Sequence, residues 1–448
     1  MTLRSCILFT STALAFALTG CAGPAKTPVT IGVGPDPILE KPSTPLFPTL
    51  KIAEAVGWSE GEKPTAAQGL EAKAFATGLD HPRWLHVLPN GDVLVAETNA
   101  PERPDEGKGI RGYFQGQAMT KAGATAPTAN RITLLRDADG DGVAETKSVF
   151  MSSLNSPFGM ALANGRLYIA NTDGVVSVPY TARMTQVTAT PERLTDLPAG
   201  TRNHHWTKSL IASRDGSKLY ATVGSNSNVG ENGLEVEEGR AAIWEIDTAT
   251  GQKRLFATGL RNPNGMAWEP KTGVLWTAVN ERDELGHNIV PDYITSVKDG
   301  AFYGWPWSYY GQTVDTRVKP PRPDMVVKAI KPDYAVGAHT ASLGLAFADG
   351  AHLGSRFSEG AFVGQHGSWN RNPFSGYKVI FIPFANGKPS GDAVDVLTGF
   401  VDANDKAHGR PVGVAIGNDG SLLVADDVGN TIWRVTSSSP NEAAVAAK

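Results

Sequence analysis

Residues 157–170 read PFGMALANGRLYIA, in which two apolar runs flank an Asn-Gly pair. Such a pair between strand-like runs indicates a tight β-hairpin, because both residues tolerate the positive φ angles of a two-residue turn. The same order of strand, Asn-Gly or Asp-Gly type turn and second strand occurs six times, with the fifth copy less regular. The copies cover residues 82–97, 157–170, 205–222, 263–278, 343–364 and 411–425. Hairpins that return every roughly 50 to 80 residues are typical of radial repeat architectures.

Further strand-like runs fill the gaps between these hairpins, for example residues 242–247 and 430–435. Each repeat then holds about four strands, which is the make-up of a propeller blade. The 49 glycines and 30 prolines suit many short strands joined by tight turns. A length of 448 residues is compatible with two or three domains, but all-β domains often exceed the usual size. The sequence therefore predicts an all-β fold, a six-bladed β-propeller with four-stranded antiparallel blades over residues 71–436.

Residues 1–20 have the pattern of a bacterial export signal. Arg4 precedes an apolar run that is too short to span a bilayer. Leu18-Thr19-Gly20-Cys21 then resembles a lipobox, in which the Cys21 thiol is the attachment site of a diacylglycerol. We interpret residues 1–20 as a lipoprotein signal peptide, with an ordinary secretory signal as the alternative. Ala22 in place of Asp favours the outer membrane, so we expect an exported protein that is lipid-anchored on the periplasmic side.

Composition and charge narrow the class of protein further. Residues 21–70 are rich in Pro, Thr, Ala and Gly and are expected to form a tether and lead-in, and residues 437–448 a tail. A net charge of −4 without basic runs gives no electrostatic footprint for nucleic acid. Removal of the signal peptide leaves Cys21 alone. The exported domain is therefore expected to have no disulfide, no cysteine-based zinc site and no thiol nucleophile.

Loops that enter the innermost strand of each blade converge around the central channel at one face, so their polar residues are the candidates for chemistry. The first cluster is Arg202-Asn203-His204-His205-Trp206. A neutral imidazole can accept a proton from an alcohol near neutral pH, since its ordinary pKa is about 6.5. The alternative is a pair of hydrogen-bonded structural histidines.

Three further regions carry charged or aromatic side chains. Arg261 and Asn262 lie in an Arg-Asn-Pro turn, where the arginine either offers a forked donor for a carboxylate or quinone oxygen or is simply exposed. Residues 280–286 read NERDELG, and such carboxylates and loop carbonyls suit Ca²⁺, although a charged surface loop has the same composition. Two more segments place Trp369, Arg371 and Arg410 beside strand entries.

The order of these motifs resembles that of the soluble pyrroloquinoline quinone (PQQ)-dependent sugar dehydrogenases, and most of all their sorbosone dehydrogenase-like branch. The motifs are His-His, Arg-Asn-Pro, Asn-Glu-Arg-Asp, Tyr-Gly-Trp-Pro, His-Gly-Ser-Trp-Asn-Arg and Arg-Pro-x-Gly, spread over residues 75–436. Each motif alone is a weak signal, whereas their shared order on a six-bladed frame is specific. In that family the cofactor lies flat over the channel, with Ca²⁺ at its quinone–pyridine edge.

The resemblance implies roles for individual residues. His205 would be the general base that takes the hydroxyl proton while hydride passes to the quinone. Arg261 and Asn262 would lie at the reactive quinone oxygens, where a donor stabilises developing negative charge. Backbone oxygens near Asp283 and Glu284 would hold the calcium ion. The further cofactor-binding residues that the resemblance implies are His204, Asn226, Trp369, Arg371 and Arg410, with the two arginines at the tricarboxylate.

Three departures from the family pattern bear on the substrate and the metal. The resemblance places an Asp before the catalytic histidine of glucose-oxidising members, where this chain has His204. It places a Gly-Pro backbone in the cation loop, where this chain has residues 282–284, and a Gln where this chain has the shorter Asn226. Glucose as the substrate and the calcium geometry are therefore left open.

A separate loop over residues 137–142 matches the first half of a calcium loop, because Asp137, Asp139 and Asp141 alternate before a glycine. The twelfth position is Ser148 instead of Glu, so the segment is no EF-hand. A structural calcium site and a bare acidic hairpin are both compatible with this pattern.

We therefore expect an oxidoreductase that uses PQQ and calcium to oxidise a sugar, a sorbosone-like aldehyde or a related polyol. The sequence has no Cys-x-x-Cys-His haem motif, so electrons are expected to pass to a separate acceptor, a cytochrome or a quinone. One alternative is a calcium-dependent lactonase-like hydrolase, for which Glu97 and Asn280 could serve as ligands. Another is a non-catalytic scaffold or sensor propeller held by its lipid anchor.

Overall fold

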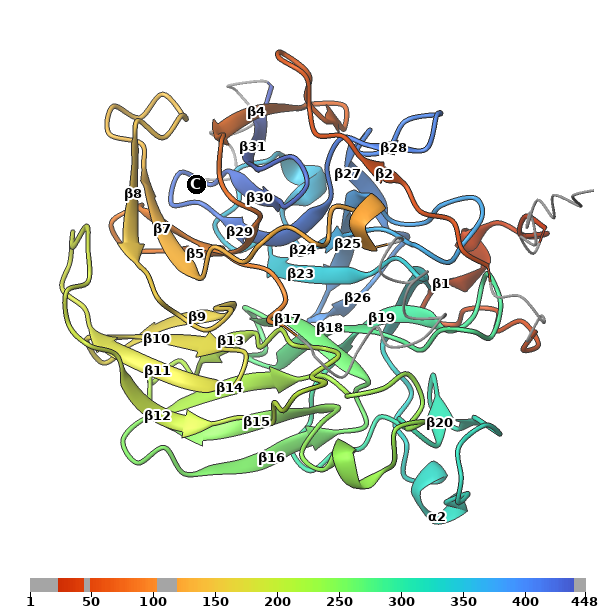
Figure 1. Cartoon of the computed structure of the whole chain (residues 1–448). Helices are drawn as coiled ribbons and strands as arrows, with labels where there is room; N and C mark the ends of the chain where they lie inside the picture. The colour runs from red at the N-terminus through yellow and green to blue at the C-terminus, as the bar shows by residue number, and fades with distance from the viewer. Residues whose placement is uncertain (1–22, 44–48, 103–118, 439–448) are drawn as a thin grey trace, which may run out of the picture.

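Six antiparallel sheets stand around one axis in the computed structural model, which describes residues 23–43, 49–102 and 119–438. Figure 1 shows the chain passing from blade to blade around this axis as its colour runs from orange to blue. The prediction of a six-bladed β-propeller with four-stranded antiparallel blades is confirmed. The predicted signal peptide, Cys21 and most of the predicted tail lie outside the described residues.

Each of the first three blades consists of four consecutive strands, which follow one another from the channel outward. Blade 1 comprises β5 (Pro82–Val87), β6 (Val93–Glu97), β7 (Arg131–Arg136) and β8 (Thr146–Met151). Blade 2 comprises β9 (Met160–Ala163), β10 (Arg166–Asn171), β11 (Gly174–Pro179) and β12 (Glu192–Asp196). Blade 3 comprises β13 (Leu210–Ala212), β14 (Lys218–Val223), β15 (Ala242–Asp247) and β16 (Lys253–Thr258).

The last three blades each take a strand from the N-terminal part of the chain. Blade 4 comprises β17 (Asn262–Trp268), β18 (Leu275–Asn280), β19 (Pro291–Ser296) and β22 (Tyr334–Ala338), with β1 (Val33–Gly34) at its edge. Blade 5 comprises β23 (Ser342–Phe347), β24 (Gly360–Gln365), β25 (Lys378–Ala385) and β27 (Val394–Thr398), with β3 (Thr65–Ala66) at its edge and β26 (Lys388–Pro389) beside β25. Blade 6 comprises β29 (Pro411–Ile416), β30 (Leu422–Asp426), β31 (Thr431–Ser437) and β4 (Leu70–Ala76).

The pairing of β4 with β31 closes the ring. Register pairs join the two strands from Ile432 with Ala76 to Ser437 with Leu70. A strand from before the first blade thus completes the last blade, so backbone hydrogen bonds hold the two ends of the propeller together. These bonds also cover a sheet edge that an unclosed blade would leave unpaired.

Glycines in and beside the inner strands let neighbouring blades approach closely. A Cβ on Gly265 of β17 would lie 2.5 Å from the carbonyl oxygen of Leu343 in β23, and a Cβ on Gly413 of β29 would lie 2.8 Å from that of Arg83 in β5. The same close approach recurs between Gly159 and Leu210 and between Gly344 and Val412. Any larger residue would overlap with backbone atoms of the next blade, so each of these glycines is required for space.

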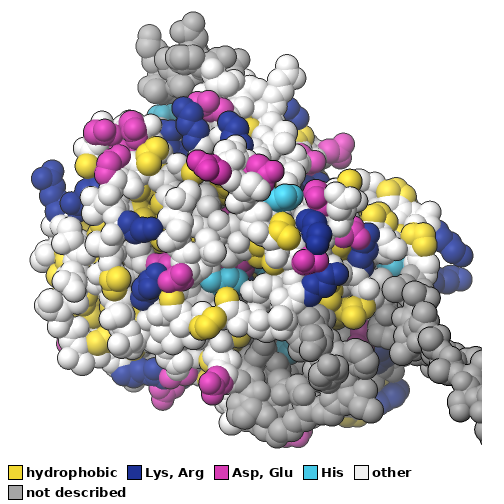
Figure 2. Space-filling model, turned by 45° about the horizontal axis from the view of Figure 1, so that its top comes forward, with side chains coloured by type: hydrophobic (Ala, Val, Ile, Leu, Met, Phe, Trp, Pro, Cys, Tyr) yellow, Lys and Arg dark blue, Asp and Glu magenta, His cyan; other side chains and the backbone are white. Residues whose placement is uncertain are grey.

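Several short elements lie outside the blades. They are the 3-10 turns η1 (Val29–Gly32), η2 (Glu235–Glu237) and η3 (Ser355–Phe357), the helix α2 (Pro323–Val326), and the strand pairs β20 (Ser308–Tyr309) with β21 (Thr313–Val314) and β2 (Glu54–Ala55) with β28 (Lys406–Ala407). Among the described residues, no helix is both long and apolar enough to cross a membrane. Figure 2 shows acidic and basic side chains interspersed over one face of the molecule, which gives that face no field of a single sign.

The stretch expected to act as a tether packs against the blades wherever the structure describes it. Besides β1 and β3, it contributes Trp58, whose ring meets those of Trp433 and Phe400 edge-on at centroid distances of 5.4 Å and 5.6 Å. The indole nitrogen of Trp58 donates a hydrogen bond of 2.7 Å to the buried carboxylate of Asp426. The lead-in therefore adds apolar surface and a hydrogen bond to the core between blades 5 and 6.

We expect the Trp58→Ala variant to lower the free energy of unfolding by about 3 kcal/mol, since it removes a packed aromatic ring and a donor to a buried carboxylate. Urea-induced unfolding measures this loss. Trp369→Ala is the matched control, because Trp369 is exposed and its removal should change the unfolding free energy by less than about 0.5 kcal/mol. Equal stability of the two variants would show that Trp58 does not stabilise the fold.

Candidate functional site

His205 lies in the loop that enters β13 and is oriented by the end of β14. Its Nδ1 is 2.7 Å from the carbonyl oxygen of Ser225, so Nδ1 is protonated and donates a hydrogen bond to that oxygen. This tautomer leaves Nε2 as an acceptor, and no residue in the described part of the chain forms a hydrogen bond with it. A Cβ on Gly224 would overlap with His205, so this glycine lets the imidazole lie against the strand end. The histidine is thus held at one nitrogen and open at the other.

The surroundings of His205 keep its ring neutral. Burial lowers the pKa of His205 well below its ordinary value, and the positive charges of Arg261 and Lys208 and the neighbouring His204 lower it further. The carbonyl of Ser225 opposes this shift, because it accepts a hydrogen bond from the protonated nitrogen. The imidazole therefore remains a proton acceptor at neutral and mildly acidic pH.

Arg261 is a fixed positive charge at the entry of β17. Its Nη1 donates to the carbonyl of Glu281 at 2.7 Å, and its Nε and Nη2 donate to the carbonyl and side-chain oxygens of Asn228 at 3.2 Å and 3.0 Å. Its Nη2 also lies 3.5 Å from Asp283. Because these partners occupy most of its donors, Arg261 acts on its neighbours mainly through its charge.

Asp283 forms an ion pair with His339 beneath Arg261. Its carboxylate accepts hydrogen bonds from His339 Nδ1 at 3.2 Å and Asn370 Nδ2 at 2.8 Å. His339 Nε2 donates to the carbonyl of Gly286 at 2.9 Å, so both ring nitrogens face acceptors. Although burial opposes both charged forms, the pairing raises the pKa of His339 and lowers that of Asp283 to about 2. His339 is therefore a structural cation of the site.

The same loop was expected to present backbone oxygens to calcium. The carbonyl of Asp283 accepts hydrogen bonds from Asn228 Nδ2 at 3.2 Å and Arg317 Nη1 at 3.1 Å, and the neighbouring Arg282 is fully buried. Glu284 is exposed and has a positive φ. A carbonyl that already faces a guanidinium is a poor ligand for a divalent cation. These contacts do not favour calcium at Asp283 and Glu284, and their assignment as metal ligands stays a prediction.

Side-chain amides line the channel beside His205. Asn262 Nδ2 lies 3.5 Å from Asn280 Oδ1, and Asn264 donates to the carbonyl of Asn262 at 3.1 Å. Asn262 Oδ1 is buried and has no hydrogen-bond partner among the described residues. The side chain of Asn226 is held by the backbone of His204, since its Oδ1 accepts from the backbone nitrogen of His204 at 3.2 Å. Asn262 and Asn226 thus lie near His205, and their cofactor-binding roles stay predictions.

A second group of basic side chains surrounds Asp427, at the channel end of β30. His366 Nε2 lies 2.8 Å and Arg83 Nη1 2.7 Å from its carboxylate, and His81 Nε2 lies 3.5 Å away. Pairing with His366, His81 and Arg83 holds the pKa of Asp427 far below its ordinary value despite burial, and burial lowers that of His366 to about 4. Arg410 lies close enough to lower the pKa of His366 further. One ionised carboxylate thus faces two arginines and two histidines.

Three buried nitrogens of this second group have no hydrogen-bond partner in the part of the chain that the structure describes: Arg83 Nε, Arg410 Nε and His81 Nε2. The guanidinium of Arg83 lies 5.9 Å from the ring of Trp206, the neighbour of His205, so the two groups of residues meet across the channel. Buried donors without partners cost free energy, which an anion in the channel would recover. The sequence analysis missed Arg83 and Asp427. Their positions at the channel ends of β5 and β30 were the available signal.

Arg371 and Trp369 lie away from this group. Arg371 is buried, and its donors reach Asn288 Oδ1 at 2.9 Å and the carbonyls of Pro373 and His287 at 2.6 Å and 3.1 Å. Trp369 is 46% exposed. The cofactor-binding roles that the sequence analysis gave to these two residues stay predictions, and the contacts of Arg371 leave it few donors for a ligand.

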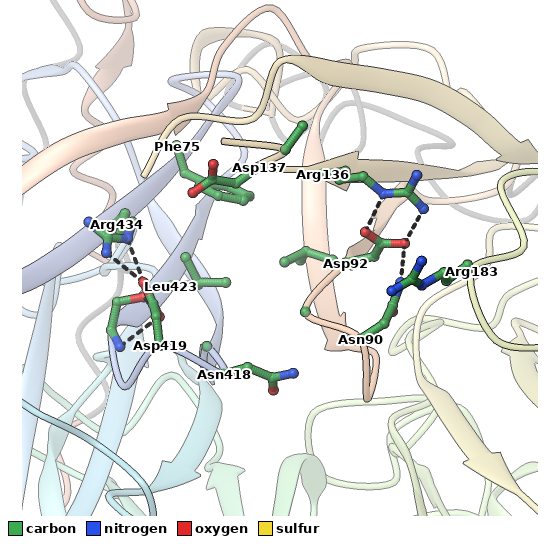
Figure 3. A pocket seen from close by; sticks show the side chains of 15 residues that line it. Phe75, Asn90, Asp92, Arg136, Asp137, Arg183, Asn418, Asp419, Leu423 and Arg434 are labelled. Atoms are coloured by element: carbon green, nitrogen blue, oxygen red, sulfur yellow. Dashed lines mark hydrogen bonds and ion pairs between the residues drawn. The ribbon is translucent and has the colours of Figure 1, made fainter. Parts of the chain in front are cut away.

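The acidic loop that follows β7 lies at the opposite end of the blades. Side-chain oxygens of Asp137, Asp139, Asp141 and Glu145 all lie within 4.8 Å of one another. Glu145 is a fourth carboxylate that the sequence analysis did not include. The loop borders a cavity of about 450 Å³ between blades 6 and 1, and Figure 3 shows two ion pairs on its walls, Arg136 with Asp92 and Arg434 with Asp419. The calcium interpretation of this loop stays a prediction.

Known proteins resemble the chain in sequence as well. A family model described as TrAA12-like matches residues 127–296 and 324–438. An uncharacterised protein of Borreliella burgdorferi is 27% identical over 369 residues, which cover 78% of this chain and 90% of that protein. A pyrroloquinoline quinone-dependent pyranose dehydrogenase of Coprinopsis cinerea is 25% identical over 433 residues, which cover 82% of this chain and 54% of that protein. The chain therefore spans about half the length of that dehydrogenase.

Solved structures share the fold. The iodide structure of the Trichoderma reesei protein of carbohydrate-active enzymes family AA12 has a TM-score of 0.67 and 20% identity, covering 87% of this chain and 100% of that one. The calcium structure from the same family and organism has a TM-score of 0.66 and 19% identity, covering 87% and 99%. The holo form of the PQQ domain of the Coprinopsis cinerea pyranose dehydrogenase has a TM-score of 0.65 and 20% identity, covering 86% and 100%.

The charge of Arg261 is expected to depress the pKa of His205, so the Arg261→Gln variant should raise that pKa toward its ordinary value. Titration of the imidazole by NMR measures the shift. His86 provides an internal control, because burial alone lowers its pKa to about 4 and the substitution should leave it unchanged. An unchanged His205 pKa in the folded variant would remove Arg261 from the causes.

Proposed function

The chain belongs to the TrAA12-like family, and from that premise we propose that it is a PQQ-dependent dehydrogenase that oxidises a sugar, a sorbosone-like aldehyde or a related polyol. The membership agrees with the family resemblance predicted from the motif order. The observation that carries the proposal is the state of His205, a neutral imidazole with Nε2 open beside a channel lined by cations. The names of two relatives support the same reaction class: the Coprinopsis cinerea pyranose dehydrogenase and a pyrroloquinoline quinone-dependent sugar dehydrogenase of Hypocrea jecorina, which is 26% identical over 234 residues.

The residues at the channel suit an anionic, planar cofactor. Arg83 and Arg410 each have a buried Nε without a hydrogen-bond partner among the described residues, and His81 Nε2 has only the 3.5 Å contact with Asp427. Carboxylates are the groups that guanidinium donors bind best. These side chains would hold the carboxylates of PQQ, while Asn262 and Arg261 line the other side of the channel. When bound there, PQQ supplies the acceptor for the hydride of the substrate.

His205 would take the proton of the substrate hydroxyl at Nε2 as a hydride leaves the carbon that bears this hydroxyl. The hydrogen bond from Nδ1 to Ser225 fixes the ring and stabilises the imidazolium that results, because the carbonyl dipole faces the developing charge. The positive charge of Arg261 favours rapid loss of this proton, because it disfavours the charged imidazole. A base of this kind contributes about 10² to 10⁴ in rate.

For calcium, the relatives and the contacts of the predicted ligands point in different directions. The calcium structure from Trichoderma reesei supports calcium in a protein of this fold, but the carbonyl of Asp283 already faces Asn228 and Arg317. No step of the proposed reaction therefore passes through a metal ion at Asp283 or Glu284. The four carboxylates around Asp137 offer the donor type that calcium prefers, at the end of the propeller away from His205.

The lactonase alternative has less support. Glu97 is fully buried, and Arg131 binds both of its oxygens at 3.0 Å and 2.8 Å. A carboxylate that is already neutralised by an arginine is a poor metal ligand. Asn280 donates to the carbonyl of Ser342 at 2.7 Å, which fixes its amide. The scaffold alternative gives no reason for the unpartnered nitrogens among the described residues of the channel.

The location of the protein is a further part of the proposal. The lipobox at Cys21 supports export and a lipid anchor on the periplasmic side, most simply at the outer membrane. Electrons would leave to a separate cytochrome or quinone, since the sequence carries no haem-attachment motif.

The His205→Gln variant should lose about 10²- to 10⁴-fold in sugar-dependent dye reduction and still bind PQQ, because glutamine keeps the volume but accepts no proton. A panel of aldoses and polyols, assayed with the PQQ-loaded protein, measures the rate. His352→Gln is the control, since His352 lies beside Gly420 at the opposite end of the blades. A fully active His205→Gln variant would exclude His205 as the base. A loaded wild-type protein that oxidises no member of the panel would contradict the proposed substrate class.

The Arg83→Gln variant should raise the dissociation constant of PQQ at least about tenfold, because a hydrogen bond between charged groups contributes about 1.5 to 3 kcal/mol. Absorbance titration of the apo-protein measures the constant. Arg371→Gln is the comparison, since Arg371 donates its hydrogen bonds to other groups of the protein. A larger loss in Arg371→Gln than in Arg83→Gln would restore the role that the motif resemblance implied for Arg371.

A further inference from the structure

The lead-in before the propeller is docked on the two loops that flank the candidate site. The backbone nitrogen of Ser43 donates to the carbonyl of Leu285 at 2.7 Å, on the loop that carries Asp283. That of Ala25 donates to the carbonyl of Asn372 at 2.7 Å, on the loop that carries Asn370. These two loops are themselves joined by the hydrogen bond between Asn370 and Asp283. The lead-in therefore borders the channel mouth.

The docking begins at the first residues that the structure describes. His287 Nε2 lies 2.9 Å from the carbonyl of Gly23. Asn288, which is buried, donates to the carbonyl and hydroxyl oxygens of Thr27 at 3.1 Å and 2.7 Å. Arg371 binds the side chain of Asn288 from the other side at 2.9 Å. The segment after Gly23 is thus held by buried polar side chains and does not act as a flexible spacer.

The position of the lipobox cysteine then has a geometric consequence. Cys21 precedes Gly23 by two residues. An extended chain spans at most about 3.6 Å per residue, so Cys21 reaches no farther than about 7 Å from Gly23. A flexible tether over residues 21–70 would have allowed the propeller to stand far from the bilayer. With the lead-in docked, acyl chains on Cys21 bring the surface around Gly23 to the lipid headgroups.

The side chains around this surface suit a lipid interface. Trp369 and Leu50 are each 46% exposed, and the backbone nitrogen of Lys51 donates to the carbonyl of Trp369 at 2.9 Å, so the two apolar side chains belong to one rim. Ile38 of the lead-in is 63% exposed, and Lys26 and Lys41 are exposed as well, while the exposed Asp36 pairs with Lys331. Tryptophan is enriched at the headgroup level of membranes, and lysines are attracted to anionic lipids.

We propose that the anchor rim, defined as residues 23–43 and 49–51 together with Trp369, lies on the bilayer surface, so that the channel mouth opens beside the membrane. The inference rests on the proposed lipid anchor at Cys21 and is independent of the reaction that the site catalyses. The partner of this rim is a phospholipid surface.

Quenching of tryptophan fluorescence by brominated lipids tests the proposal. The full-length lipidated protein is reconstituted into phosphatidylcholine and phosphatidylglycerol vesicles with bromine near the headgroup end of the acyl chains. Wild-type protein should lose a part of its emission that the Trp369→Phe variant does not lose. Trp244→Phe is the matched control, because Trp244 lies in β15 of blade 3 and its removal should leave the quenched part intact.

Equal quenching in wild type and Trp369→Phe would overturn the proposal, because the rim would then be away from the lipid. The mass of the mature N-terminal peptide checks the anchor separately, and an unmodified Cys21 would overturn the proposal as well. Dye reduction by the same vesicles reports on the proposed dehydrogenase activity. A failure of that activity with intact Trp369 quenching leaves the orientation standing.

Discussion

The close approach of neighbouring inner strands is the constraint on which the rest of this structure depends. At Gly265 and Gly413 the backbone of one blade touches that of the next, with no room for a side chain. This approach keeps the channel narrow enough for loops of different blades to meet. Arg83 at the start of β5 and Asp427 after β30 form an ion pair of 2.7 Å only because blades 1 and 6 are pressed together. Close packing of the ring is therefore the physical origin of the site.

Within that ring, the electrostatics of the site follow from burial. Charges that leave water need partners, and in this channel Asp283 pairs with Arg261 and His339, while Asp427 pairs with Arg83 and accepts from His366. Arg261 donates its hydrogen bonds to other groups of the protein. Near Asp427, in contrast, Arg83 and Arg410 each have a buried Nε without a hydrogen-bond partner among the described residues. His205 lies beside Arg261 and opposite the group around Asp427. Its neutrality and its open nitrogen are consequences of the charges around it as much as of its own position.

The lead-in adds a second level of organisation. Its strands extend blades 4 and 5, and Trp58 packs into the core between blades 5 and 6. Its first described residues form hydrogen bonds to the loops at the channel mouth. A segment of low periodicity thus supports both the fold and the rim of the site. Sequence composition favoured a tether because Pro- and Gly-rich stretches resemble linkers, and composition does not register the backbone hydrogen bonds that a neighbouring loop supplies.

The sequence by itself determined the number of blades, the inner hairpin of each blade and the face on which polar loops gather, because strand periodicity and turn chemistry are local properties. It also singled out His205, Arg261 and Arg410 through the motif order. Only the tertiary structure decided which of the predicted residues have free donors. Arg371 donates to Asn288, and Asp427 joins the site although only its position at the end of a predicted strand marks it in the sequence. These differences come from contacts between residues far apart in the chain, such as Arg83 with Asp427 and His287 with Gly23, which exist only once the ring has closed.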